Sequence, residues 1–346
     1  MLDVRHRDRP VVSCGIGTDA LGTPIDPDTL FAVYCSTKPV VALAIGLLVE
    51  DGELSWDDRL GDVVDEPIAA GLKPVTVTEL LTHTAGLHNL RADHMLARSP
   101  TDRRTVARQH VPPDGWSSAS HLAYSNFLGW FWLVRIIEAI TDAPAREHLR
   151  SAVLDPLSLT GEIFTGFAPS EVAFAAAACA VNIDLTGSRP IPMLLERSPS
   201  FMSDPDLAAA GGYASIHGLC SLYQGLMTIL DSPDEQAAGL PKHLIETMVE
   251  PRVAGREDPV MGRSGPWGLG FMVDLRHHRF GEHASARSFG HSGNAGASFA
   301  FCDPVHDLSV AVLYTAKVDN TYAVDIRRHA FLTNLYEALG LANEDL

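Results

Sequence analysis

This chain of 346 residues has few cysteines and few basic residues. Its five cysteines are odd in number, widely scattered and without CxxC spacing, so the sequence predicts free thiols rather than a disulfide framework or a zinc site. Lysine and arginine together number 26 against 43 aspartates and glutamates, which gives a formal net charge of -17. An acidic protein is not attracted to nucleic acid or to an anionic membrane, so we expect small-molecule partners instead.

A long hydrophobic run is also missing. The longest apolar stretch near the start, residues 39–49, is too short to span a bilayer, and the acidic residues and glycine that follow it are typical of a helix stop. The first ten residues are charged and lack the apolar core and cleavage site of a secretory signal. We therefore expect a core helix here, no membrane association and a cytoplasmic location.

The spacing of the apolar residues predicts a mixed fold. Helical periodicity occupies residues 36–49, 75–81, 128–140 and 322–339. Short β-rich runs bounded by turn residues occupy residues 11–17, 267–273, 287–291, 297–302 and 308–316. Strands at both ends of a helical middle indicate an α+β fold, in which one antiparallel β-sheet is flanked by helices and the last helix packs on that sheet.

The chain is expected to form a single domain, residues 1–346, because 46% of it is hydrophobic and no low-complexity linker interrupts it. The predicted α/β lobe comprises about residues 1–40 and 260–346. An inserted, mainly helical lobe comprises about residues 41–259, in which the alanine-rich residues 171–180 are expected to fill the core. The two lobes would share one interface and one cleft.

The strongest chemical signal lies at the start of the first long helix. Cys35 and Lys38 are three residues apart, so their side chains share one face of the first turn. At that separation a proton can pass between the two groups, or the ammonium can stabilise a thiolate. The partial positive charge of the helix N-terminus favours the thiolate as well. The pattern therefore predicts a nucleophilic cysteine.

Several separated segments, taken in order, resemble the serine β-lactamase and penicillin-binding-protein superfamily, especially its esterase-like and class C-like branch. Cys35 and Lys38 fall at the serine and lysine of the S-x-x-K motif, and residues 124–126 (Y-S-N) resemble the Y-x-N element. The strand motif K-T-G becomes H-S-G at residues 291–293. Supporting segments occur in the family's order at residues 75–87, 211–213 and 267–270.

This resemblance implies a β-lactamase/transpeptidase-like fold and a role for each matching residue. Cys35 would be the nucleophile, with Lys38 and Tyr124 as its proton-handling partners, and Asn126 would orient a substrate amide or carbonyl. The backbone N–H groups of Cys35 and Asn294 would form the oxyanion hole. The substrate-binding positions of the strand motif would be His291, Ser292, Gly293 and Asn294. No cofactor and no metal is implied.

The chemistry of the site predicts two further properties. A phenol near Lys38 and His291 would ionise more easily, so Tyr124 is a second candidate base, which could then return a proton to the leaving group. His291 in place of lysine weakens the fixed positive charge that would bind a substrate carboxylate, so a β-lactam or D-Ala-D-Ala-like substrate is not expected. His291→Lys is expected to shift preference toward carboxylate-bearing substrates.

Structural explanations compete with these roles. Cys35 could be a buried structural thiol or a replacement that abolishes activity. Ser36 is rotated about 100° around the helix from Cys35, away from the partners of Lys38, which makes it a poor nucleophile. No acidic third ligand accompanies His83 and His88, which are expected to be structural. Three more histidines are expected to be solvated side chains of a hairpin rather than a zinc site: His277, His278 and His283.

The sequence thus predicts an enzyme that takes an acyl group from a small-molecule donor onto Cys35. Because a thioester favours aminolysis over hydrolysis relative to an ester, transfer to an amine or alcohol acceptor is the preferred hypothesis. The alternative within enzymes is a plain esterase or amidase. A binding protein that has lost turnover is the third possibility, and the retained pair of Lys38 and Tyr124 argues against it.

Overall fold

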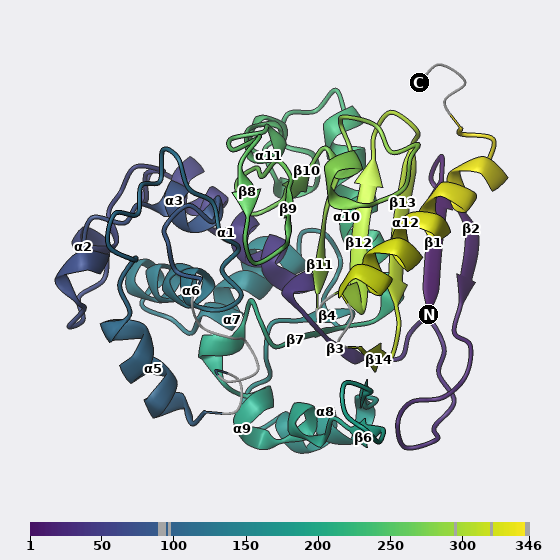
Figure 1. Cartoon of the computed structure of the whole chain (residues 1–346), viewed down its shortest axis with the longest axis horizontal. Helices are drawn as coiled ribbons and strands as arrows, with labels where there is room; N and C mark the ends of the chain where they lie inside the picture. The colour runs from purple at the N-terminus through teal and green to yellow at the C-terminus, as the bar shows by residue number, and fades with distance from the viewer. Residues whose placement is uncertain (89–94, 96–97, 294–295, 319–320, 343–346) are drawn as a thin grey trace.

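The fold is built on one six-stranded antiparallel sheet, with the strand order β10-β11-β12-β13-β1-β2. The computed structural model describes residues 1–346 apart from 89–94, 96–97, 294–295, 319–320 and 343–346. The strands are β1 (Leu2–His6), β2 (Arg9–Cys14), β10 (Met272–Val273), β11 (Phe289–Gly293), β12 (Ser298–Asp303) and β13 (Leu308–Leu313). The two ends of the chain therefore pair in one sheet, which confirms the predicted α+β class (Figure 1).

Each face of this sheet is covered by one long helix. Phe299 and Phe301 of β12 join the core that includes Tyr336 of α12 (Thr321–Ala338), as predicted for the last helix. The alternate residues, Ala300 and Cys302, join the core of the opposite face, which α10 (Ile216–Asp231) covers. This alternation follows from the two-residue period of a strand. The small side chains on the second face let α10 lie close to the sheet.

The helix α10 falls inside the range predicted for the helical lobe, 41–259, yet it packs on the sheet. Among the described residues, the rest of that range also holds the following α-helices, of which the first begins just before residue 41: α1 (Lys38–Glu50), α2 (Leu60–Val63), α3 (Val77–Leu81), α5 (Pro100–Gln109), α6 (Leu128–Thr141), α7 (Ala145–Leu149), α8 (Val172–Ala178), α9 (Pro199–Met202) and α11 (Lys242–Val249). Within the described residues, no helix has the length and apolar composition that a bilayer crossing requires.

The predicted helices of the first half are present with small shifts at their ends. The segment 75–81 becomes α3, which begins two residues later because Thr76 and Glu79 form a capping box. The segment 128–140 becomes α6, and both tryptophans of that helix are fully buried. The alanine-rich segment does not fill the core as expected. In α8 only Val172 and Ala175 are buried and Phe174 is 80% exposed, because this short helix lies at the surface.

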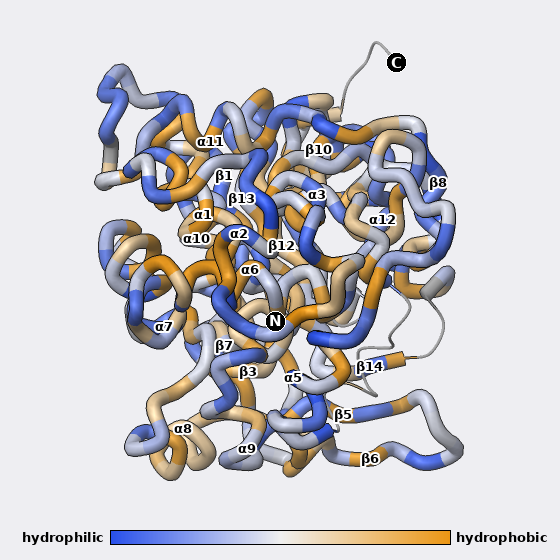
Figure 2. The backbone as a smooth tube through the Cα atoms, turned by 90° about the vertical axis from the view of Figure 1, so that its left-hand side faces the viewer, coloured by the Kyte–Doolittle hydropathy of each residue, from blue (hydrophilic) through white to orange (hydrophobic). Residues whose placement is uncertain are grey.

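Three small sheets complete the fold. One joins β3 (Phe31–Tyr34), β4 (Ile163–Phe164) and β7 (Gly212–Ala214), the second joins β5 (Ile183–Asp184), β6 (Ile191–Pro192) and β14 (Ala316–Lys317), and the third pairs β8 (Glu257–Asp258) with β9 (Arg263–Ser264). Figures 1 and 2 both place β6, α8 and α9 at one end of the molecule, beneath β3, β7 and β14. This end supplies one side of the pocket described next.

Candidate active site

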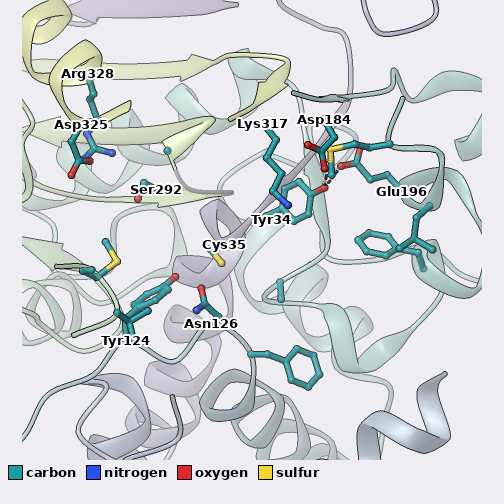
Figure 3. Close-up of a pocket in the computed structure, with 18 of the residues that line it drawn as sticks. Tyr34, Cys35, Tyr124, Asn126, Asp184, Glu196, Ser292, Lys317, Asp325 and Arg328 are labelled. Carbon is teal, nitrogen blue, oxygen red and sulfur yellow. Dashed lines mark hydrogen bonds and ion pairs between the residues drawn. The ribbon is translucent and has the colours of Figure 1, made fainter. Parts of the chain in front are cut away.

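A cavity of about 610 Å³ opens above Cys35 (Figure 3). Segments far apart in the sequence line it: the β3–α1 junction, residues 124–127, residues 184–201, β11, β14 and α12. Cys35 itself is partly exposed to this space. A pocket of this size has room for a drug-sized molecule, and the predicted nucleophile lies in its lining.

A strained turn presents Cys35 to the cavity. The preceding residue, Tyr34, has a backbone φ angle of 52°, which residues other than glycine rarely adopt. Cys35 then begins a short 3₁₀ turn, Cys35–Thr37, that leads into α1 at Lys38. Residues three apart are eclipsed in a 3₁₀ helix, so this turn stacks Cys35 directly over Lys38.

Lys38 is fully buried beneath the thiol. Its Nζ donates hydrogen bonds to the carbonyl oxygens of Asn126 at 2.9 Å and Ala209 at 3.2 Å. The nitrogen lies 4.8 Å from the centroid of the Trp130 ring. Burial lowers the pKa of Lys38, while the charge of Cys35 and the hydrogen bond to it act in the opposite direction. Two backbone carbonyl oxygens thus hold the Lys38 nitrogen beneath the thiol.

Tyr124 approaches the same sulfur from another side. Its ring centroid is 5.8 Å from Lys38 Nζ, and its backbone N–H donates to both carboxylate oxygens of Asp258 at 3.1 Å. The expectation that this phenol ionises more easily is wrong. Burial, together with the charges of Cys35 and Asp258, raises the pKa of Tyr124 well above its ordinary value. The phenol is therefore a neutral hydrogen-bond donor.

His83 holds Tyr124 in place from behind. Its Nδ1 accepts a hydrogen bond from the Ser125 N–H at 3.1 Å, and its carbonyl accepts one from the Ala123 N–H at 3.1 Å. The imidazole ring lies 4.5 Å from the rings of both Tyr124 and Trp267. Burial lowers the pKa of His83 well below its ordinary value, so the ring stays neutral and Nδ1 can accept. The sequence indicated a structural histidine but not its contact with the site.

His291 does not line the cavity, contrary to expectation. It is fully buried, its Nδ1 hydrogen-bonds to the Ser292 carbonyl at 2.7 Å, and its ring centroid is 6.1 Å from that of Tyr124. Burial and the nearby charge of Lys38 lower the pKa of His291 to about 3. The alternation of β11 turns Ser292 toward the cavity and His291 away from it. The substitution His291→Lys would therefore bury a second cation beside Lys38 rather than extend one toward a substrate.

The other predicted substrate-binding positions lie around the thiol. Asn126 and Ser292 line the cavity. Gly293 lies so close to the nucleophile turn that an added Cβ would meet Val33 O at 2.2 Å, so only glycine lets β11 approach this closely. Asn294, the expected second oxyanion donor, lies outside the described residues.

Sequence reasoning missed the opposite side of the cavity. There Glu196 is buried, accepts a short hydrogen bond from Tyr34 Oη, and accepts hydrogen bonds from Asn182 Nδ2 at 3.3 and 3.0 Å. Burial raises the pKa of Glu196 to about 7. Asp184 and Lys317 line the cavity nearby and carry opposite charges. Tyr34, Asp184 and Lys317 lie in three short strands and Glu196 lies in a 3₁₀ turn. The sequence around them contains no recognisable motif.

Metal chemistry is not indicated by the residues present. Among the described residues, no group of three or more histidine, cysteine or acidic side chains could hold a metal ion. All five cysteines are free.

The fold places the chain among penicillin-binding-protein and esterase structures. A penicillin-binding protein homologue from Caulobacter crescentus superimposes with a TM-score of 0.71 at 23% identity, covering 97% of this chain and 91% of that one. EstCE1, described as a hydrolase with promiscuous acyltransferase activity, gives a TM-score of 0.73 at 17% identity over 96% and 92% of the two chains. At these identities the likeness shows the fold.

The sequence itself matches the β-lactamase family model over residues 2–335, so the chain belongs to the β-lactamase family. Esterase EstB of Burkholderia gladioli is 43% identical over 77 residues, which is 21% of this chain and 20% of that protein. Two mycobacterial relatives match 55% of this chain and 51% of their own length, so the match spans about half of these proteins.

Proposed function

We propose that this protein is an acyl-transfer enzyme that carries the acyl group as a thioester on Cys35 and passes it to a small-molecule acceptor. The observation that carries this proposal is the position of the Cys35 thiol, which lies beside both Lys38 and Tyr124 at the floor of a large cavity. A free structural thiol would need neither a buried lysine nor a buried phenol.

In the first half-reaction, the thiol of Cys35 gives its proton to the neutral amine of Lys38, and the thiolate attacks the carbonyl carbon of the donor beside the ammonium so formed. The tetrahedral intermediate collapses when the bond to the leaving group breaks. The leaving group takes a proton from Lys38, directly or through Tyr124, which Lys38 then reprotonates, so that Lys38 ends as a neutral amine. Tyr124 suits this role because its raised pKa keeps it protonated. The product of this half-reaction is the acyl thioester on Cys35.

In the second half-reaction, an acceptor attacks the thioester and loses a proton to Lys38. The carbon–sulfur bond then breaks and Cys35 leaves as a thiolate beside the ammonium. An amine is the preferred acceptor, since thioesters favour aminolysis over hydrolysis relative to oxygen esters. Water is the alternative acceptor, and the similarity to the esterase EstB favours it as the second candidate.

Intact-mass spectrometry after incubation with simple acyl thioesters tests the proposal. The wild type should gain the mass of one acyl group, Cys35→Ala should gain none, and Cys35→Ser should be acylated more slowly because an alcohol is a weaker nucleophile. Added amine should then remove the acyl group faster than water does. Acylation of Cys35→Ala at the wild-type rate would refute Cys35 as the nucleophile, and release by water alone would make the protein a hydrolase.

A further inference from the structure

A group of apolar side chains borders the cavity on the side of Glu196, and we call it the apolar wall: Ile191, Met193, Leu194, Leu195 and Phe201. Three of them are far more exposed than large apolar residues usually are, with Ile191 60%, Leu194 57% and Leu195 48% exposed. They lie at the cavity itself rather than scattered over the surface. Contiguous exposed apolar side chains at a pocket mark a site that a ligand covers.

Four of the charged groups in the cavity lining already have partners within the protein. Asp325 forms ion pairs with both Arg263 and Arg328. Glu196 is held by Tyr34 and Asn182 on the other side. Apart from the cation of Lys317, a ligand on the side of the wall therefore gains more from apolar contact than from charge, because its own charge would have to compete with these existing bonds.

The position of Tyr124 indicates which part of a donor faces the wall. The leaving group must lie near Tyr124, since this phenol is the neutral proton donor beside Cys35. Figure 3 shows Tyr124 on one side of Cys35, with Tyr34 and Glu196 on the other. The substituent on the far side of the carbonyl carbon, which is the acyl chain, is thus directed toward Glu196 and the wall.

We propose that the apolar wall binds the hydrocarbon chain of the acyl group, so that the enzyme selects donors with an aliphatic or aromatic acyl chain of several carbons over acetyl donors. This inference rests on the proposed acyl transfer and names the donor class of that same site. Burial of one methylene group contributes about 0.8 kcal/mol. This corresponds to roughly a fourfold gain in rate for each methylene group added to the chain, until the wall is filled.

The test compares acetyl, butanoyl, hexanoyl and octanoyl thioesters of N-acetylcysteamine, with the acylation rate of Cys35 followed by intact-mass spectrometry. The octanoyl rate should exceed the acetyl rate by at least tenfold in the wild type. Leu194→Asp and Leu195→Asp should each lower this octanoyl-to-acetyl ratio by about tenfold. Val305→Asp is the matched control, because Val305 is 55% exposed and lies outside the cavity lining, and it should leave the ratio unchanged.

A second measurement separates failure of this inference from failure of the proposed function. Unreactive N-methyl alkanamides of two to eight carbons are titrated into the wild type and into Leu194→Asp by calorimetry. Affinity that rises with chain length in the wild type and not in the variant supports the wall even if no donor acylates Cys35, a result that would refute only the proposed function. Equal acylation rates for acetyl and octanoyl donors, or affinity independent of chain length, would overturn the inference.

Discussion

The two sides of the pocket are built in different ways. On the side of Tyr124, buried residues from short motifs interlock, and the rings of His83 and Trp267 fix the phenol against the thiol. On the side of Tyr34, most of the surface comes from one segment, residues 182–201, whose longest regular element has four residues. Under the proposed function, the side of Tyr124 would carry out the reaction, which needs fixed geometry. The side of Tyr34 would select the substrate, which a loop can do.

Burial governs the electrostatics of both sides, with opposite results. Beside the thiol, burial lowers the pKa of Lys38 and His291 and raises that of Tyr124. His291 and Tyr124 therefore stay neutral, and Lys38 is the group of the three that can exchange a proton. On the other side it raises the pKa of Glu196 to about 7, so this carboxyl titrates near neutrality. In the proposed reaction, the first set would transfer protons, whereas Glu196 would change the charge of the other side of the pocket with pH.

The largest effect is expected from Lys38→Met, which keeps the length of the side chain and removes the ammonium. Loss of the proton acceptor and cation beside Cys35 should lower the acylation rate about 10³-fold and slow the reaction of Cys35 with iodoacetamide. Peptide mass mapping measures the rate at which iodoacetamide alkylates Cys35, and intact-mass spectrometry measures the rate of acylation.

The control for this variant is Lys317→Met, which removes the cation on the other side of the same cavity. It should change the alkylation rate of Cys35 by less than a factor of about three, because charges across a partly solvated pocket interact weakly. Equal losses in the two variants would show that any pocket cation suffices, and the distinction between the two sides would break down.

Glu196→Gln tests the other side through stability. The folded-state pKa of Glu196 is about 7 against an ordinary value of 4.5, so the folded protein keeps this proton at pH values where the unfolded chain has lost it. The contribution is fully present below pH 4.5 and is lost as the pH rises to 7. The free energy of unfolding of the wild type relative to Glu196→Gln should therefore fall by about 3 kcal/mol across this window.

Urea unfolding of both proteins at pH values from 4.5 to 7.5 measures this difference. Glu246→Gln, at an exposed position of α11, is the control and should show no such pH dependence relative to the wild type. A constant difference between the wild type and Glu196→Gln would mean that the carboxyl ionises in the folded protein as it does in the unfolded chain.

The sequence predicted the sheet and the catalytic side because both follow from local spacing. Strand alternation and helical periodicity located the segments of the main sheet, and the three-residue interval placed Cys35 on Lys38. The sequence could not predict which face of β11 carries His291, because a shift of one residue moves every side chain of a strand to the opposite face of the sheet. The pKa of Tyr124 could not be predicted either, because it depends on burial by segments distant in the sequence. Tyr34 and Glu196 are 162 residues apart, and no sequence motif indicates that they form a hydrogen bond.

Tyr124→Phe removes the phenolic hydroxyl and keeps the ring packed between its neighbours. Acyl transfer should fall about 10²-fold, because the phenolic hydroxyl is the proposed proton donor for the leaving group. The loss should be nearly constant from pH 6 to 9, since the raised pKa of Tyr124 keeps the hydroxyl protonated over this range. Steady-state rates with a thioester donor and an amine acceptor measure it.

Tyr223→Phe is the matched control for this loss. Tyr223 is a second fully buried tyrosine, and its hydroxyl has no hydrogen-bond partner among the described residues. This variant should retain the wild-type rate. A Tyr124→Phe variant as active as Tyr223→Phe would remove Tyr124 from the mechanism and leave Lys38 as the sole proton carrier.

The smallest effect is expected at Ser36, the residue next to the nucleophile. Ser298 Oγ donates to the Val33 carbonyl at 2.9 Å, so Ser36 Oγ must donate to Ser298 Oγ, which is also 2.9 Å away. Ser36 is 1% exposed and is tied to the sheet rather than to the cavity. Ser36→Ala should lower the free energy of unfolding by about 1 kcal/mol through the lost hydrogen bond and leave acylation unchanged. Urea unfolding and intact-mass acylation of Ser36→Ala and Cys35→Ala, measured side by side, check both points. If Cys35→Ala were acylated and Ser36→Ala were not, the nucleophile would be an alcohol, the intermediate would be an ester, and the argument for transfer to amines would lose its chemical basis.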